Sequence, residues 1–149
     1  MDSFINDYSK CMEQINAGGL MQALHMSLIR LERDRAEGTL EVHPDSLNPY
    51  GYVHGGILTT LSDTVAGVAA ASRGGMSVTL SHTLNYLRPA TGRTIYCAAT
   101  PQRVGKTISV FQVSLTNEDG VLVATGLFTF HIDRTRPGPL KLEELPTKE

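Results

Sequence analysis

The segment 46–72 constrains the fold most strongly, because it contains a long stretch that is almost free of charge. In SLNPYGYVHGGILTTLSDTVAGVAAAS the only charged residue is Asp63. Apolar side chains recur at helical spacing after Gly55-Gly56, which predicts a helix that starts there and ends near 72–75. A surface helix normally carries charged side chains on its outer face. We therefore expect this helix to be covered on both sides.

Asp63 falls on the side of this helix that points away from the apolar stripe. At 100° per residue, Ile57 and Leu61 mark the stripe and Asp63 lies at about 240° from Ile57. Its neighbours on that face are small: Thr59, Ala66, Gly67 and Ala70. Small side chains permit close approach of another backbone, and a second copy of the chain is the economical candidate. Burial of an unpaired carboxylate is costly. Asp63 therefore serves a function or a polar network, or else it faces water and only keeps the helix soluble.

The remaining segments predict an α+β fold with a mostly antiparallel sheet of about six strands. An amphipathic helix is expected over residues 3–16, with Gly18-Gly19 as its stop. Alternation and turn residues predict strands at 21–34, 39–43, 77–87, 93–104, 106–117 and 121–132. The last four are expected to form a meander. We expect one domain over residues 1–149, with its core at about 20–133 and a C-terminal tail at 134–149.

Composition excludes several classes of protein. The chain has 149 residues and a formal net charge of −2, which favours neither a nucleic acid nor a membrane surface as partner. Its N-terminus lacks the pattern of a signal peptide, and two cysteines make no disulfide framework, so we expect a cytoplasmic protein. The five histidines show no metal-ligand spacing. A nucleophile elbow, a phosphate loop and a dinucleotide fingerprint are also absent from the sequence. We expect neither a metal nor an organic cofactor.

The start of the helix suggests a binding site for a polarised oxygen. Free N–H groups at a helix N-terminus favour negative charge, and glycine lets a ligand approach the backbone closely, although a lone Gly-Gly is also found in plain turns. Gly55 and Asp63 are about 12 Å apart along a helix that rises ~1.5 Å per residue. One small reacting group cannot touch both in one chain. If they share a site, Asp63 must come from another copy of the subunit.

Asn48, His54-Gly55-Gly56 and Asp63, followed by LNYLRPATG and RVGKTISVFQVSLTNEDGVLVATGLFTF, resemble the signature of a known family. This combination is similar to hotdog-fold acyl-CoA thioesterases of the PaaI-like and 4-hydroxybenzoyl-CoA thioesterase group, over about residues 20–132. The resemblance implies a long central helix wrapped by an antiparallel sheet, here preceded by an N-terminal helix. It also implies a homodimer joined sheet edge to sheet edge, the further pairing of dimers into a homotetramer, and an active site at the dimer interface.

The resemblance assigns roles to individual residues. The Gly55 amide would polarise the thioester carbonyl, with Asn48 and His54 lining the same side. Asp63 of the neighbouring subunit would be the nucleophile or the general base, and Thr79 would help to orient the water. Coenzyme A carries phosphates, so basic residues should surround the entrance. The candidates, each of which could equally be a solvated turn residue, are Lys106 first, then Arg103 and Arg88.

The sequence thus predicts an acyl-CoA thioesterase that converts an acyl- or aryl-CoA into a carboxylic acid and free CoA. A hotdog hydratase or dehydratase is an alternative that also uses a histidine and an acid, but the spacing from His54-Gly55-Gly56 to Asp63 favours the thioesterase. A non-catalytic acyl-CoA-binding module is the other alternative. It is weaker, since regulators of this kind usually carry a DNA-binding segment, and only about 20 residues precede the first expected strand.

Overall fold

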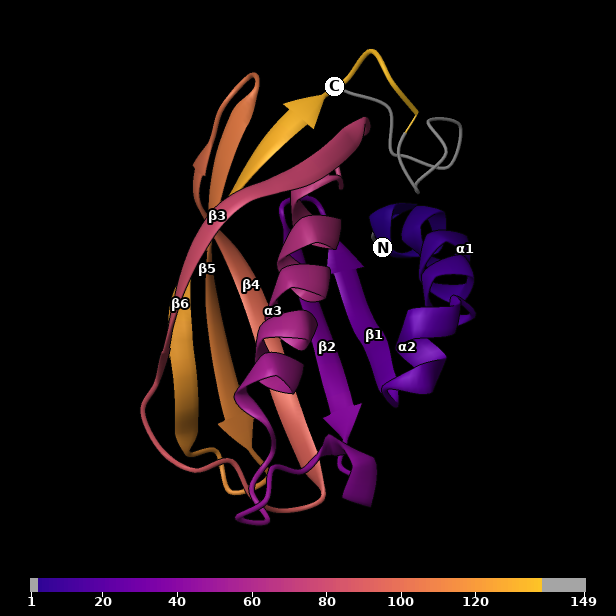
Figure 1. The fold of residues 1–149 in the computed structure, drawn as a ribbon. Helices are drawn as coiled ribbons and strands as arrows, with labels where there is room; N and C mark the ends of the chain where they lie inside the picture. Colours follow the sequence, from indigo (N-terminus) through magenta and orange to yellow (C-terminus); the bar gives the residue numbers. More distant parts are fainter. Residues whose placement is uncertain (1–2, 138–149) are drawn as a thin grey trace.

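The computed structural model describes the backbone of residues 3–137 and the side chains of residues 8–137 (Figure 1). The part of the expected tail beyond residue 137 lies outside this range. The helices are α1 (Ser3–Asn16), α2 (Gly19–Ala23), the 3₁₀ turn η1 (Pro44–Ser46) and α3 (Gly55–Ala70). The strands are β1 (Met26–Glu32), β2 (Arg35–Glu41), β3 (Met76–Tyr86), β4 (Thr94–Val104), β5 (Ile108–Asn117) and β6 (Leu122–Asp133).

All six strands form one antiparallel sheet in the order β1-β2-β4-β5-β6-β3. Figure 1 shows α3 lying across one face of this sheet and α1 beside β1 at its edge. The apolar stripe of α3 faces the sheet, and Leu58, Leu61 and Val65 are buried there with Phe111 and Phe128. The predicted α+β fold, with a long central helix and an N-terminal helix, is confirmed. Among residues 3–137, no helix is both long and apolar enough to span a bilayer.

The predicted four-stranded meander is wrong in one respect. β4, β5 and β6 are consecutive neighbours, but β3 pairs with β6 instead of β4. The connection from Leu87 to Arg93 explains the difference. Its amide and carbonyl groups bond to Val123 at one end and to Val42 at the other, so it carries the chain from the edge of the sheet back to its middle. A seven-residue connection is longer than the two to five residues usual in a hairpin.

The start of the first predicted strand is also wrong. Residues 19–23 form the short helix α2, and the strand begins only at Met26. Two residues with positive φ set these boundaries: His25 (58°) follows the helix, and Asp34 (61°) makes the turn between β1 and β2. This turn comes before Arg35, so β2 occupies the segment expected to be the turn.

The two edges of the sheet differ in how they are covered. On β1, the Asn16 side chain donates from Nδ2 to the Leu28 carbonyl (3.0 Å) and accepts from the Leu28 amide at Oδ1 (2.7 Å). A side chain from α1 thus stands where a neighbouring strand would bond. β3 is longer, at 11 residues, and exposes Val78 (47%) and Leu80 (57%). Open strand edges are templates for pairing, so β3 is the edge available to another chain.

Gly126 is expected to be the glycine that this edge tolerates least when replaced. A Cβ at Gly126 would lie 1.9 Å from the Thr83 carbonyl oxygen, a contact that only backbone movement can relieve. We expect Gly126→Ala to lower the free energy of unfolding by about 2–4 kcal/mol, measured by urea denaturation. Gly19→Ala is the matched control, because nothing lies within 4 Å of its added Cβ. Equal stability of the two variants would contradict this packing of β3 on β6.

Candidate active site

The first turn of α3 leaves one amide unused. His54 is the N-cap, and its Nδ1 accepts from the Gly56 amide at 2.8 Å. The amides of Ile57 and Leu58 both donate to the His54 carbonyl oxygen. Within residues 3–137, the Gly55 amide has no acceptor. It is therefore a free donor at the positive end of the helix dipole, where a developing negative charge on oxygen is stabilised.

Tyr86, at the end of β3, holds this first turn in place. Its hydroxyl donates to the Gly55 carbonyl oxygen (2.9 Å) and shares a hydrogen bond with Thr59 Oγ1 (2.5 Å). A Cβ at Gly55 would meet the Tyr86 ring at 3.3 Å, so the ring lies directly against the glycine. Tyr86 was not among the site residues predicted from the sequence. The available signal was an aromatic hydroxyl at the end of the strand that follows the helix.

A groove of about 340 Å³ opens beside the first turn. Its wall includes Asn48, Gly55, Tyr86 and Arg88. Asn48 is fixed by its loop, since its Oδ1 accepts from the amides of Tyr50 (2.9 Å) and Tyr52 (3.1 Å). The structure therefore brings together three of the residues predicted from the sequence, Asn48, Gly55 and Arg88, with His54 as the helix cap next to them.

Asp63 and Thr79 form a second cluster. The Thr79 hydroxyl donates to Asp63 Oδ1 at 2.6 Å, and both side chains are half-buried. Asp63 lies two turns of α3 beyond Gly55, about 12 Å along the helix axis. Each chain thus carries two parts that could act on one substrate but do not meet within the chain.

A bulge in β3 directs both clusters toward α3. The register of β3 against β6 shifts between Thr79 and Ser81. Before the shift, Ser77 donates to the Gly67 carbonyl oxygen, and Thr79 donates to Asp63 Oδ1. After the shift, the Tyr86 hydroxyl donates to the Gly55 carbonyl oxygen. Residues 79 and 86 would point to opposite faces of a regular strand. The expected uninterrupted alternation of β3 is therefore wrong, because a bulge redirects the side chains.

These contacts also change the interpretation of the outer face of α3. The small residues there were expected to indicate a partner subunit. Instead, β3 of the same chain bonds along this face, and Ala66 and Ala70 are buried within the single chain. The small residues are therefore not evidence for a partner subunit. The distance between Gly55 and Asp63 remains the evidence for one.

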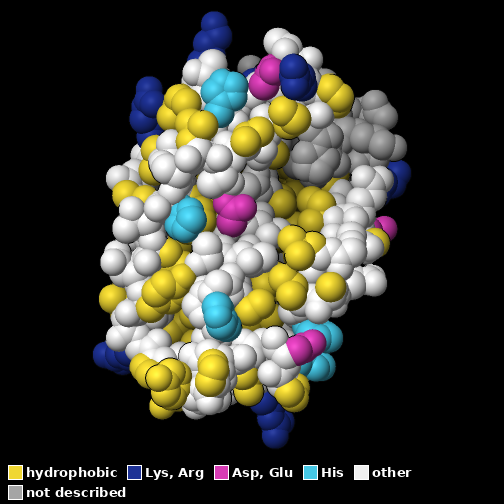
Figure 2. Space-filling model, viewed as in Figure 1, with side chains coloured by type: hydrophobic (Ala, Val, Ile, Leu, Met, Phe, Trp, Pro, Cys, Tyr) yellow, Lys and Arg dark blue, Asp and Glu magenta, His cyan; other side chains and the backbone are white. Residues whose placement is uncertain are grey.

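The basic residues predicted to bind CoA lie at two ends of the sheet. Arg88 lines the groove beside Gly55. Arg103 and Lys106 are exposed at the β4–β5 hairpin, which lies at the end opposite the first turn of α3 (Figure 1). On the face that Figure 2 shows, Lys and Arg side chains gather near the rim and few charges occupy the middle.

Cysteine chemistry is excluded at Cys97. Burial raises the pKa of this thiol to about 12, and a hydrogen bond with Ser62 only partly opposes the shift. A thiol with this pKa is protonated near neutral pH and is a poor nucleophile. Asp63, the only charged residue of α3, therefore remains the candidate for the nucleophile or general base.

Comparisons with known proteins agree with this geometry. Residues 50–124, which include Gly55, Asp63 and Thr79, match the family model of the thioesterase superfamily. The acyl-coenzyme A thioesterase PaaI of Escherichia coli is 31% identical over 104 residues, or 69% of this chain and 74% of that protein. Human acyl-coenzyme A thioesterase 13 is 33% identical over 97 residues, or 62% of this chain and 69% of that protein.

Solved structures show the same fold. The structure of E. coli PaaI superposes with a TM-score of 0.81 at 25% identity, covering 88% of this chain and 96% of that one. A Streptococcus mutans protein bound to acetyl CoA gives a TM-score of 0.71 at 32% identity, covering 74% of this chain and 90% of that one. The present chain belongs to the thioesterase superfamily, in which it is a hotdog-fold thioester hydrolase of the PaaI-like group.

Proposed function

We propose that the protein hydrolyses acyl- or aryl-CoA thioesters to a carboxylic acid and free CoA, at sites shared between two subunits. The observation that carries this proposal is the pair of separated clusters: the free Gly55 amide at one position and the Asp63–Thr79 pair two helical turns away. The names of the relatives support the substrate class. The buried thiol of Cys97 fits a reducing cytoplasm, where thiols persist.

The open edge of β3 supports the shared site. Two β3 strands that pair antiparallel around their middle residue, Ser81, would place the Thr79 half of one strand beside the Tyr86 half of the other. Asp63 lies next to Thr79, and Gly55 lies next to Tyr86. This pairing would therefore bring Asp63 of one subunit toward the Gly55 groove of its neighbour.

Two dimers would then pair into a homotetramer. A hollow on the outer face of the sheet supports this step, because its only charged lining residue is Glu37 of β2. The side chains that β4 and β5 contribute to its lining are uncharged, among them Tyr96, Ala98, Ser114 and Thr116.

The chemistry follows from these positions. The thioester carbonyl oxygen would accept from the Gly55 amide, which stabilises the negative charge as the carbonyl carbon is attacked. Asp63 would either attack this carbon itself, releasing CoA thiolate and leaving an anhydride for water to hydrolyse, or remove a proton from the attacking water. Thr79 would hold Oδ1 of the carboxylate, so that Oδ2 faces the reaction. Neither step uses a metal or an organic cofactor other than the CoA of the substrate.

The CoA moiety would lie between basic residues of both subunits. Arg88 would approach it from the groove that holds the carbonyl. Lys106 and Arg103 lie at the other end of their own sheet, so in an antiparallel dimer they would reach the substrate from the subunit that supplies Asp63.

Thiol release from a panel of aliphatic and aromatic acyl-CoAs tests the proposed function. Release from at least one member, with stoichiometric acid formation, is the expected result. Hydration of an enoyl-CoA without thiol release would indicate a hydratase instead. Binding of acyl-CoA without any turnover would indicate a non-catalytic module.

Tyr86→Phe is expected to lower kcat by about 2- to 10-fold with little change in KM, which corresponds to one ordinary hydrogen bond. The ring would still line the groove, but the Gly55 carbonyl would keep only the Thr59 hydroxyl (3.1 Å) as a side-chain donor, and the first turn would be held less firmly. Steady-state kinetics on the best substrate measure the effect. Tyr96→Phe, on the outward face of β4, is the control. An unchanged kcat in Tyr86→Phe would show that the hydroxyl does not position the turn.

A further inference from the structure

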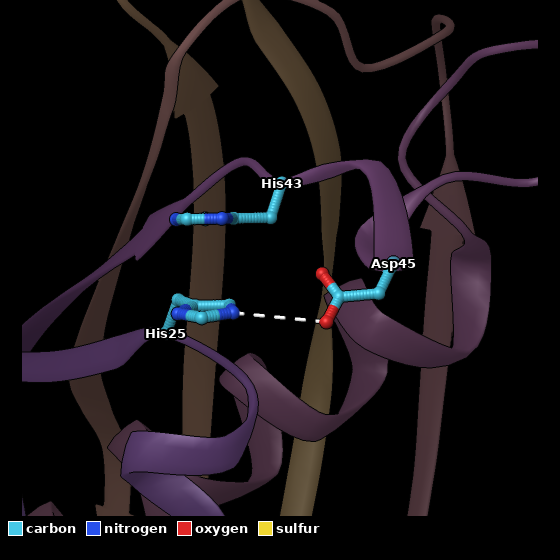
Figure 3. Close-up of side chains that lie close together, drawn as sticks. All are labelled: His25, His43 and Asp45. Atoms are coloured by element: carbon cyan, nitrogen blue, oxygen red, sulfur yellow. Dashed lines mark ion pairs between the residues drawn. The ribbon is translucent and has the colours of Figure 1, made fainter.

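Two histidines and an aspartate lie together outside the candidate active site (Figure 3). His25 comes between α2 and β1, His43 follows β2, and Asp45 belongs to η1. The imidazole rings stack with centroids 3.7 Å apart and planes at 13°. His25 Nε2 lies 3.7 Å from Asp45 Oδ2, and one potential ligand atom of each residue lies within 4.8 Å of the other two.

The backbone at His25 is unusual for this residue type. Its φ of 58° is left-handed, in the position after a helix that glycine occupies most readily. Backbone bonds hold it on both sides: its amide donates to the Gln22 carbonyl oxygen (3.2 Å), and its carbonyl oxygen accepts from the Glu41 amide (2.9 Å). The chain thus carries an imidazole where glycine would be less strained, and the imidazole meets His43.

We propose that His25, His43 and Asp45 bind one divalent transition-metal ion of the Zn²⁺ type. Two imidazole nitrogens and a carboxylate oxygen are ligands that such ions prefer. Glu41 supports the set, since its Oε1 lies 3.8 Å from His43 Nε2, where it can become a fourth ligand or orient the ring. The two carboxylates also supply the negative charge that a cation site needs.

The cluster must tighten to hold the ion. Tetrahedral Zn²⁺ with bonds near 2.1 Å places its ligand atoms about 3.4 Å apart. The longest separation of 4.8 Å must therefore shorten, and the stacked rings must open because imidazole lone pairs lie in the ring plane. The side chains have the freedom to do so, being 32% (His25), 39% (His43) and 71% (Asp45) exposed.

A bound ion would connect three segments that precede the active-site loop. It would join the start of β1, the end of β2 and η1. The next residue, Ser46, accepts from the His54 amide at its carbonyl oxygen (2.8 Å), so η1 is bonded directly to the N-cap of α3. The ion would thus stabilise the loop that carries Asn48. This proposal does not rest on thioester hydrolysis.

The test is a titration of the tag-free, chelator-treated full chain with Zn²⁺ by calorimetry and with Co²⁺ by visible absorption. We expect one ion per chain, and an unfolding temperature that rises with Zn²⁺ concentration. His25→Gly should weaken binding at least about tenfold, and so should Asp45→Asn. Glycine suits the backbone at position 25, so the metal-free His25→Gly variant should unfold at the same temperature as the wild type or higher.

His131→Ala is the matched control, because it removes an exposed histidine of β6 far along the chain. It should leave the affinity unchanged. Absence of binding at 1:1 stoichiometry in the wild type would overturn the proposal. So would an affinity that His25→Gly and His131→Ala reduce equally, because the ion would then be held by scattered surface histidines.

Discussion

Asp63→Asn is expected to lower kcat for acyl-CoA hydrolysis by about 10³-fold, within the range typical for loss of a general base. Asparagine has nearly the same shape and can still accept from the Thr79 hydroxyl, which in the wild type donates to Asp63 Oδ1 at 2.6 Å. It cannot attack a carbonyl or take a proton from water. The fold should therefore persist while the chemistry fails, and steady-state thiol release measures the loss.

Two controls sharpen this experiment. Asp119→Asn removes an exposed carboxylate in the β5–β6 turn and should leave kcat unchanged. Thr79→Val keeps the shape of the threonine but removes its hydrogen bond, so a loss smaller than that of Asp63→Asn is expected. Wild-type activity in Asp63→Asn would remove Asp63 from the mechanism.

Gly55→Pro is expected to lower kcat by about 10²- to 10³-fold, the usual loss when one oxyanion donor is removed. Proline removes the N–H group that the site would use, and it also adds the carbons of its ring. Gly55 is the first residue of α3, a position where proline is readily accepted. The backbone at His54, with φ −59° and ψ 135°, is also the extended conformation that precedes proline.

Gly55→Ala separates the amide from the added bulk. A Cβ at this position lies 3.3 Å from the Tyr86 ring in either variant, but alanine keeps the N–H group. We expect Gly55→Ala to retain much more activity than Gly55→Pro. Equal losses in both would show that the Cβ, rather than the missing donor, is responsible. Circular dichroism of both variants confirms that α3 is intact.

The sequence predicted those parts of the fold that local patterns determine. The helix from Gly55 was evident from its apolar stripe and its His54-Gly55-Gly56 start, and it ends at Ala70 in the structure. The pairing of β3 with β6 could not be predicted, because it depends on where a connection crosses the sheet. Helix α2 was mistaken for a strand because five residues show too little periodicity to distinguish the two.

The candidate site was predictable in its residue types and less so in its arrangement. Asp63 and Thr79 were both proposed, and the structure places them in hydrogen-bond contact. Tyr86 was missed because the bulge that turns it toward Gly55 has no sequence signature. His25, His43 and Asp45 have no metal-ligand spacing because only the pairing of β1 with β2 brings them together.

We propose that each active site takes Gly55 from one subunit and Asp63 from another. The most direct test of this proposal is the activity of an equimolar mixture of Gly55→Pro and Asp63→Asn chains after subunit exchange by co-refolding. Half of the dimers formed at random contain one chain of each kind, and each of these has one intact site. We therefore predict that activity returns to about one quarter of the wild-type value per chain. If the mixture, with exchange verified by native mass spectrometry, is no more active than its separate components, the site is not shared between subunits.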